Sequence, residues 1–165
     1  MIFFIEGCSK TGKTTLIDKY MQQYPGAVRF KGSGAVNIGM QDRWQDYNFW
    51  MHNIMERLDE LNDYTTPIIW DRGLTDVVYT EDDIYASELL RVIKSHIKKA
   101  VIYIDTPVNT LETRKTKEGH EMLKHKERYE DVIKSFDYHK IVLSGNCYIT
   151  DEHVQGMNAF IKSYL

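Results

Sequence analysis

Short apolar runs alternate with amphipathic stretches along most of the chain. Runs of strand length predict β-strands at Ile2–Glu6, Ala27–Lys31, Pro67–Asp71, Ala100–Asp105 and Cys147–Thr150. Apolar residues spaced three and four apart predict helices at Thr14–Tyr24, Asp42–Leu61, Asp83–Lys99, Val108–Lys117, Tyr129–Ile141 and His153–Tyr164. Strands that are apolar on both faces and alternate with helices are typical of a parallel sheet covered on both sides. The pattern therefore predicts a three-layer α/β/α domain.

Length and composition narrow the class of protein. The 165 residues fit a single domain, and 42% hydrophobic with 27% charged residues is too apolar for disorder. No apolar run exceeds five residues, so we expect neither a membrane span nor a secretory leader. Two cysteines form no disulfide framework, which favours a reducing, cytoplasmic setting. A net charge of −3 predicts no general nucleic-acid binding. The sequence leaves open whether the protein forms a homodimer.

One local motif carries chemistry. Gly7–Thr14 matches the pattern G-x-x-x-x-G-K-[ST], follows a predicted strand and opens a predicted helix, as a phosphate-binding loop (P-loop) requires. Its backbone amides and the helix N-terminus favour phosphate oxygens, Lys13 can reach the β- and γ-phosphates, and the Thr14 hydroxyl can join a Mg²⁺ shell. The expected cradle comprises Gly7, Cys8, Ser9, Lys10, Thr11, Gly12, Lys13, Thr14 and Thr15. The motif predicts an ATP and Mg²⁺ site, and a strand-to-helix turn without a ligand is the alternative.

Other signatures are missing or weak. The chain has no N-K-x-D guanine motif, and neither of its two most apolar central strands continues to Asp-Glu as in motor ATPases. Its six histidines show no zinc-ligand spacing, so we interpret all of them as structural. Cys8 lies inside the loop, where helix-end charge favours a lowered pKa of its thiol. Its bulk beside phosphate argues against a redox role.

The motif and its surroundings resemble thymidylate kinases and related deoxynucleoside kinases. Phe4–Gly7 followed by Gly12–Thr15 is similar to the opening of these enzymes, and Ile68–Arg72 to their third strand. Asp105-Thr106-Pro107 with Arg114 resembles their fourth strand and the helix leading into a lid, and Val132–His139 and Tyr148–Asp151 match their last elements. The resemblance implies a P-loop NTPase fold, sheet order 2-3-1-4-5, and phosphoryl transfer from ATP to a nucleotide or nucleoside.

The sequence departs from that family at positions that touch the acceptor. Ser9 stands where thymidylate kinases usually carry an acidic residue that contacts the acceptor sugar. Lys10 falls where one branch has an arginine, and a lysine supplies the charge without the bidentate fork. The acceptor-binding arginine has no clear equivalent, since its place falls near Trp50 and Arg43 lies two turns upstream.

Asp71 and Arg72 end a central strand at the edge where open α/β sheets bind ligands. Arg72 is a candidate to grip a phosphate, and Asp71 to hold Mg²⁺ through water or to orient the acceptor. A phosphate monoester is already anionic at neutral pH, whereas a sugar hydroxyl needs a base, for which Asp71 is the first candidate. The alternative is a surface ion pair with a helix-capping aspartate.

A charged segment follows the fourth predicted strand. Its cations are Arg114, Lys115, Lys117, Lys124, Lys126 and Arg128, interleaved with glutamates. We interpret residues of about 115–128 as a lid that closes over ATP, with Arg114 and then Lys117 as the best catalytic candidates. A solvated pair of charged helices is the alternative.

Aromatic residues of the long second helix are candidates for an acceptor pocket. Trp44 and Tyr47 follow its apolar stripe and are expected in the core, whereas Phe49 and Trp50 lie partly off the stripe. The predicted substrate-binding residues are Ser9, Lys31 with the following Gly32–Gly34 turn, Arg43, Phe49, Trp50 and Arg72.

Together these features predict an ATP-dependent kinase that phosphorylates a nucleoside monophosphate, with a deoxynucleotide favoured. Lys10, Lys13, Arg72 and Arg114 would offset charge on the transferred group. Three alternatives remain open: a deoxynucleoside kinase acting on a sugar hydroxyl, a nucleotide-binding switch module, and a kinase for another small metabolite or a polynucleotide 5′ end.

Overall fold

The computed structural model describes residues 1–32, 34–35, 37–114, 119–145 and 147–165. A five-stranded sheet lies at its centre, with strand order β2-β3-β1-β4-β5. The strands are β1 (Ile2–Glu6), β2 (Val28–Lys31), β3 (Ile68–Asp71), β4 (Lys99–Asp105) and β5 (Asp137–Val142). Every neighbouring pair is parallel, which confirms the predicted sheet order.

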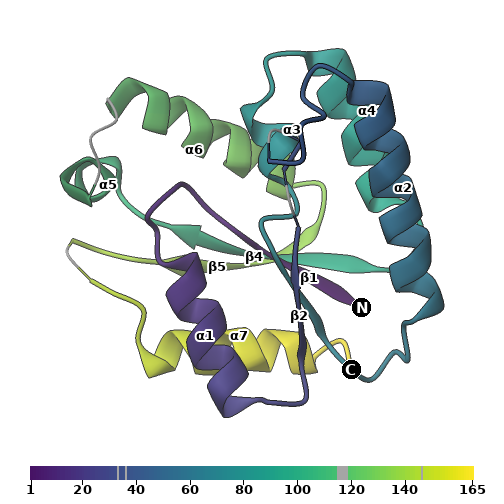
Figure 1. Cartoon of the computed structure of the whole chain (residues 1–165). Helices are drawn as coiled ribbons and strands as arrows, with labels where there is room; N and C mark the ends of the chain where they lie inside the picture. The colour runs from purple at the N-terminus through teal and green to yellow at the C-terminus, as the bar shows by residue number, and fades with distance from the viewer. Residues whose placement is uncertain (33, 36, 115–118, 146) are drawn as a thin grey trace.

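Helices cover both faces of the sheet (Figure 1). α1 (Lys13–Gln23) and α7 (Asp151–Lys162) lie on one face. The other carries α2 (Trp44–Glu60), α3 (Thr75–Tyr79), α4 (Asp83–Lys94), α5 (Val108–Arg114) and α6 (Gly119–Ile133). The predicted α/β/α layering is therefore confirmed. Among the described residues, no helix combines the length and apolarity needed to cross a membrane.

The central strands explain why the layers form. All five residues of β1 are buried, and their side chains alternate between the two faces. Ile2 and Phe4 join the core beneath α2 and α4, whereas Phe3 and Ile5 join the core beneath α1 and α7. A strand that is apolar on both faces needs a helix layer on each side, and this is what fixes the architecture.

The sequence-based prediction was wrong for the last strand. β5 spans Asp137–Val142, a stretch expected to be helical, while Cys147–Thr150 is not a strand. β5 is an edge strand with β4 as its partner, and only Ile141 is buried in it, so it lacks the apolar run by which the other strands were recognised. Ile149 is buried for another reason, because it packs against Gly12 of the phosphate loop.

Several helix boundaries also differ from expectation. α4 ends at Lys94 rather than Lys99, and a turn with His96 at φ 60 separates it from β4. α6 already begins at Gly119, and the short helix α3 was not predicted. Turn geometry of this kind depends on tertiary packing more than on local periodicity.

Gly73 follows the end of β3 and lies against the ring of Phe4. A Cβ atom at Gly73 would overlap the Cδ1 and Cε1 atoms of Phe4, whose ring is fully buried and contacts Trp70 and Phe136 edge-on. Gly73→Ala should therefore lower the free energy of unfolding by about 1–3 kcal/mol through overpacking. Urea denaturation measures this loss. Gly26→Ala is the control, since its Cβ would have no neighbour within 4 Å, and equal midpoints for the two variants would contradict the prediction.

Candidate active site

The loop between β1 and α1 curls at the carboxyl edge of the sheet. Two of its residues must be glycine for steric reasons: a Cβ at Gly7 (φ 143) would lie 2.7 Å from the Ile104 carbonyl oxygen. A Cβ at Gly12 (φ 101) would lie 3.0 Å from Cγ1 of Ile149, and both φ angles are ones that L side chains rarely adopt. The two glycines of the motif are thus explained by backbone geometry and by close neighbours.

Lys13 lies inside the curl of this loop. Its ammonium group donates to the carbonyl oxygens of Gly7 and Cys8, both at 2.6 Å, and the residue is only 4% exposed. Burial, and then the nearby Arg72 guanidinium, lower the pKa of Lys13 to about 8. No carboxylate forms an ion pair with Lys13 among the described residues, so an anionic ligand would supply a missing countercharge.

A hollow of about 470 Å³ opens beside the loop. It is lined by Ser9, Lys10, Gly12, Lys13, Thr14, Thr15, Arg72, Arg114 and Tyr148. This set contains four cationic side chains and no acidic one. The volume lies within the range of small-ligand sites, and the charge favours a polyanion.

Arg114 and Tyr148 form one wall of this hollow. The guanidinium of Arg114, at the end of α5, donates to the carbonyl oxygens of Lys10 at 3.3 Å and Cys147 at 3.0 Å. It also lies 4.9 Å from the ring centroid of Tyr148, which is 71% exposed. A planar cation over an exposed aromatic ring offers flat faces on which a nucleobase can stack. Tyr148 was not predicted as a site residue, because its segment was interpreted as a strand.

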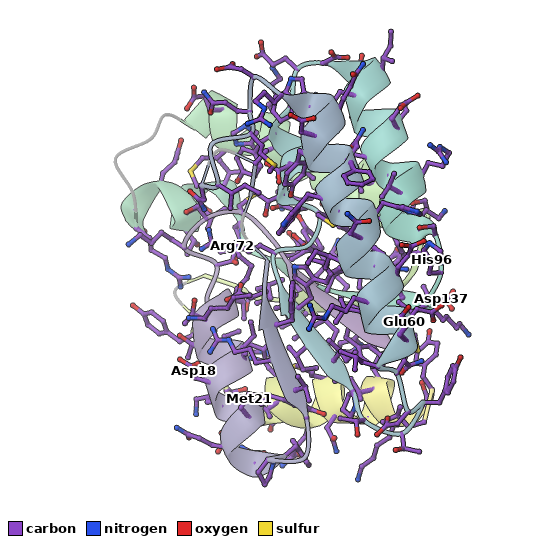
Figure 2. The ribbon with its side chains drawn as sticks, turned by 45° about the vertical axis from the view of Figure 1, so that its right-hand side comes forward. Asp18, Met21, Glu60, Arg72, His96 and Asp137 are labelled. Atoms are coloured by element: carbon purple, nitrogen blue, oxygen red, sulfur yellow. The ribbon has the colours of Figure 1, made fainter. Side chains whose placement is uncertain are left out.

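A second hollow of about 210 Å³ adjoins the first. It is lined by Gly7, Ser9, Lys13, Arg72, Thr75, Tyr79 and Tyr129. Ser9, Lys13 and Arg72 line both hollows. The Arg72 side chain, labelled in Figure 2, is 52% exposed, and the backbone of this residue adopts φ 68. Two adjoining hollows that share cations have the form of two anion subsites meeting at one point.

Glu6 ends β1 directly beneath the loop and is fully buried. Its Oε1 atom accepts a hydrogen bond from the Leu74 amide at 2.8 Å, while Oε2 has no hydrogen-bond partner among the described residues. Burial raises the pKa of Glu6 to about 7, although the Leu74 amide and Lys13 oppose the shift. Glu6 was not predicted as a site residue. The signal in the sequence was an acidic residue at the end of an otherwise apolar strand.

Asp71, at the end of β3, forms an ion pair with Arg29 of the edge strand β2. Its Oδ2 atom accepts from Arg29 at 3.1 Å, and Arg29 also pairs with Asp18 at 2.7 Å. Its Oδ1 atom lies 3.8 Å from Nε of Arg72 and has no hydrogen-bond partner in the described part of the chain. Asp71 lines neither hollow, and its Oδ2 atom serves the β2–β3 contact through Arg29.

The predicted acceptor residues outside the loop are not brought to either hollow, apart from Arg72. Lys31, Arg43, Phe49 and Trp50 line neither of them. Arg43 pairs with Asp46 at 2.6 Å, and Phe49 is 68% exposed. Trp50 stacks on Tyr47 with a centroid separation of 5.4 Å. Ser33, in the turn after Lys31, lies outside the described residues.

The predicted lid is described only in part. Lys115, Thr116, Lys117 and Glu118 lie outside the described residues. Beyond them, cations of α6 pair with other elements: Lys124 with Glu81 at 3.6 Å, Lys126 with Asp105 at 2.7 Å, and Arg128 with Asp83 at 3.7 Å. α6 also buries Met122, Tyr129 and Ile133 in the core. This part of the segment therefore packs against the body of the protein in the structure.

The Cys8 thiol is buried next to the same helix. Its Sγ atom lies 3.9 Å from the Met122 carbonyl oxygen. Burial raises the pKa of this thiol, and the opposing effects of Lys13 and Lys126 are smaller. The expected lowering of the Cys8 pKa was wrong, because desolvation outweighs the nearby positive charges.

The residues fit the group that a P-loop implies. Mg²⁺ prefers oxygen ligands and keeps several waters while sharing phosphate oxygens. The Thr14 side chain is exposed and lines the larger hollow, and the unpartnered Glu6 Oε2 and Asp71 Oδ1 atoms end the neighbouring strands β1 and β3. This donor set suits a cation held mainly by a nucleotide and water.

Nucleotide affinity should weaken as the pH rises through about 8. Phosphate binding favours protonated Lys13, so the pKa of Lys13 is higher in the complex than the value of about 8 in the free protein. Nucleotide affinity is therefore highest below pH 8. Above pH 8 it falls roughly tenfold per pH unit, until the pH reaches the pKa of Lys13 in the complex. Titrations of a nonhydrolysable adenine nucleotide between pH 7 and 9.5 measure this loss. Lys13→Met should show weak, flat binding, and a flat wild-type profile would refute the prediction.

Comparisons with known proteins agree with the fold. No family model matches the sequence, and no curated protein matches it significantly. The YorR protein of Bacillus subtilis, solved in complex with phosphorylated GDP, has a TM-score of 0.70 at 18% identity over 98% of this chain and 96% of its own. Thymidylate kinase from Candida albicans has a TM-score of 0.66 at 11% identity over 98% and 91%.

A third similar structure is the deoxyadenosine kinase of M. mycoides, with a TM-score of 0.59 at 13% identity over 99% of both chains. Identities this low establish the shared architecture. The chain has the P-loop NTPase fold of these proteins, and the resemblance predicted from the sequence is confirmed at that level.

Proposed function

We propose that the protein is an ATP-dependent phosphotransferase that phosphorylates a nucleoside monophosphate, with a deoxynucleotide as the favoured acceptor. One observation carries the proposal: two adjoining hollows share Ser9, Lys13 and Arg72, and four cationic side chains line the larger one. Phosphoryl transfer requires a donor subsite and an acceptor subsite that meet where charge develops. A single nucleotide-binding domain, residues 1–165 with a lid near 115–128, suits this reaction.

The larger hollow would bind the donor. Its triphosphate lies along the loop, where Lys13 exchanges the carbonyl oxygens of Gly7 and Cys8 for phosphate oxygens. The adenine would stack at the mouth against the Arg114–Tyr148 pair. Mg²⁺, when bound with the nucleotide, would neutralise charge on the β- and γ-phosphates beside the Thr14 hydroxyl.

The transfer would depend on positioning and electrostatics. An acceptor oxygen forms a bond to the γ-phosphorus while the bond to the β–γ bridging oxygen breaks, and ADP leaves. Arg72 lines both hollows, so its guanidinium is available to the transferred group throughout this exchange. Lys10 and Arg114 add charge from the donor side, and no covalent intermediate with the protein is required.

The phosphate end of the acceptor would occupy the smaller hollow, against Thr75, Tyr79 and Tyr129. A monophosphate needs no general base, since its second pKa is about 6. It does need a cation, and Arg72 meets that need. The thymidylate kinase and the YorR complex with phosphorylated GDP among the similar structures favour a nucleotide acceptor.

A specific observation favours a second candidate, a deoxynucleoside kinase. Glu6 is buried beneath the loop with an unpartnered oxygen and a pKa raised to about 7, which suits a general base for a sugar hydroxyl. The hydroxyl proton would pass to the Glu6 carboxylate as its oxygen attacks phosphorus. Glu6 replaces Asp71 in this role, because Arg29 holds one carboxylate oxygen of Asp71, whereas Glu6 forms no ion pair among the described residues.

Acceptor-dependent release of ADP tests the proposal. The panel should contain nucleoside monophosphates, nucleosides and hydroxyl-bearing metabolites, each with Mg²⁺-ATP. We expect turnover with a monophosphate. Silence across the panel with ATP still bound would overturn the proposal in favour of a nucleotide-binding switch.

Two variants separate the acceptor classes within the same assay. Glu6→Gln should cost less than tenfold with a monophosphate but roughly 10²–10⁴-fold with a sugar hydroxyl, the usual contribution of a general base. Asp71→Asn is the matched control, an amide in place of a carboxylate at the end of the neighbouring strand. A loss in Glu6→Gln that is the same with both acceptor classes would argue against a base role for Glu6.

A further inference from the structure

Three potential metal ligands meet at the surface between α2 and the turn after α4. Nε2 of His52 lies 3.3 Å from Oε1 of Glu56, and the rings of His52 and His96 have centroids 5.2 Å apart. One ligand atom from each of the three residues lies within 4.8 Å of the other two. Sequence spacing did not indicate this cluster, because His96 lies far from the other two residues along the chain.

The fold holds the three side chains on rigid elements. His52 and Glu56 are four residues apart and so share one face of α2, whose adjacent face buries Met51 and Met55. α4 packs along α2, and His96 follows its end in the left-handed region at φ 60, which is uncommon for residues other than glycine.

Hydrogen bonds fix this turn around His96. The Ser95 hydroxyl donates to the Val92 carbonyl oxygen, and the Lys99 ammonium donates to the carbonyl oxygens of Ser95 and Ile97. The position of His96 opposite α2 is therefore set by the backbone, independently of any ligand.

We propose that His52, Glu56 and His96 bind one divalent transition-metal ion of the zinc class. Two imidazoles and one carboxylate are a ligand set that Zn²⁺ favours, whereas Mg²⁺ and Ca²⁺ prefer oxygen ligands alone. Three protein ligands leave a fourth tetrahedral position for water or a small anion. The bound ion ties α2 to the α4–β4 turn.

This site is separate from the proposed active site. In Figure 2, His96 lies close to Asp137 and well apart from Arg72. His96 and Asp137 line a common hollow, which contains no residue of the phosphate loop. The metal would therefore stabilise the fold rather than act in phosphoryl transfer, and the proposal does not depend on the proposed function.

Neighbouring charges set limits on the affinity. The hollow beside His96 is also lined by Lys94, Lys98, Lys99 and Lys134, which oppose the binding of a cation. Three of these lysines are exposed, so salt screens their effect. Glu56 supplies the anionic ligand that offsets them, and its loss should weaken binding as strongly as the loss of an imidazole.

Zinc binding without nucleotide tests the proposal. We expect one equivalent of Zn²⁺ per chain in competition with a chromophoric chelator. His96→Asn and Glu56→Gln should each weaken the zinc affinity at least about tenfold, because even the loss of a residue that only supports a metal ligand costs tenfold or more. Asparagine is chosen at position 96 because it tolerates a positive φ. His153→Gln on α7 and Cys147→Ser are the controls and should bind zinc as the wild type does.

Two further readouts identify the ligands. Co²⁺ should give visible ligand-field bands without a thiolate charge-transfer band, since no cysteine belongs to the cluster. Zinc at a hundredfold excess over its dissociation constant should raise the unfolding midpoint by about 5–10 °C, and His96→Asn should abolish this shift. Undetectable zinc binding, unchanged affinity in His96→Asn, or loss of binding in Cys147→Ser would each overturn the proposal.

Discussion

Lys13→Ala should lower phosphoryl transfer at least 10²–10³-fold, roughly the loss that follows removal of one preorganised donor to a developing charge. Lys13 places an ammonium group inside the loop, within 2.6 Å of two main-chain carbonyl oxygens. No other lysine of the larger hollow is buried, since Lys10 is exposed. A solvated cation nearby therefore cannot replace the contribution of Lys13.

The same substitution should leave the fold intact. The pKa of Lys13 falls from its usual 10.5 to about 8 in the folded protein, so burial of its charged form opposes folding below pH 8. Removing the ammonium relieves this cost and offsets the loss of its hydrogen bonds. ADP release measures the activity, and circular dichroism with urea denaturation measures the fold.

Lys19→Ala is the matched control for Lys13→Ala. Lys19 lies on the same helix, α1, and forms an exposed ion pair with Asp151 at 3.1 Å. Exposed pairs contribute about 0–1 kcal/mol, so this variant should keep both activity and stability. If Lys13→Ala retained activity within tenfold of Lys19→Ala, the loop would not be the site of transfer.

The loop and the central strands could be predicted because their signals are local. Gly7, Gly12 and Lys13 lie at the fixed offsets of a phosphate-binding motif, which can be recognised within a few residues. The neighbours that exclude a Cβ at the two glycines, Ile104 and Ile149, are nevertheless distant in the chain. The five consecutive apolar residues at the start of the chain and the run Ala100–Ile104 reflect burial on both faces. β5 could not be recognised in this way, because an edge strand with only Ile141 buried has no such run.

The partners of site residues could not be predicted, because they depend on sheet register. Parallel pairing of β2 with β3 sets Lys31 opposite Asp71 and brings Arg29 of β2 within 3.1 Å of the Asp71 carboxylate. Glu6 instead gains its raised pKa from complete burial, against the opposing hydrogen bond from the Leu74 amide. Two acids that end neighbouring strands thus have opposite environments, which no local pattern distinguishes.

Arg72→Ala should lower kcat/KM about 10²–10³-fold and shift the pH dependence of nucleotide binding in the same protein. The first effect follows because Ser9, Lys13 and Arg72 line both hollows, and Arg72 and Lys13 are the two of them that carry a positive charge. The second follows because the Arg72 guanidinium lowers the pKa of Lys13, second only to burial.

The two effects of Arg72→Ala have separate controls. Arg72→Lys keeps a cation but loses the bidentate fork, so we expect intermediate activity and a pH profile close to that of the wild type. In Arg72→Ala the pKa of Lys13 rises, so nucleotide affinity should persist to a pH above the wild-type limit near 8 before it declines. A loss of turnover without this shift would place Arg72 away from Lys13 in solution. A shift without a loss of turnover would remove Arg72 from the transfer step and leave Lys13 as the only shared cation of the two hollows.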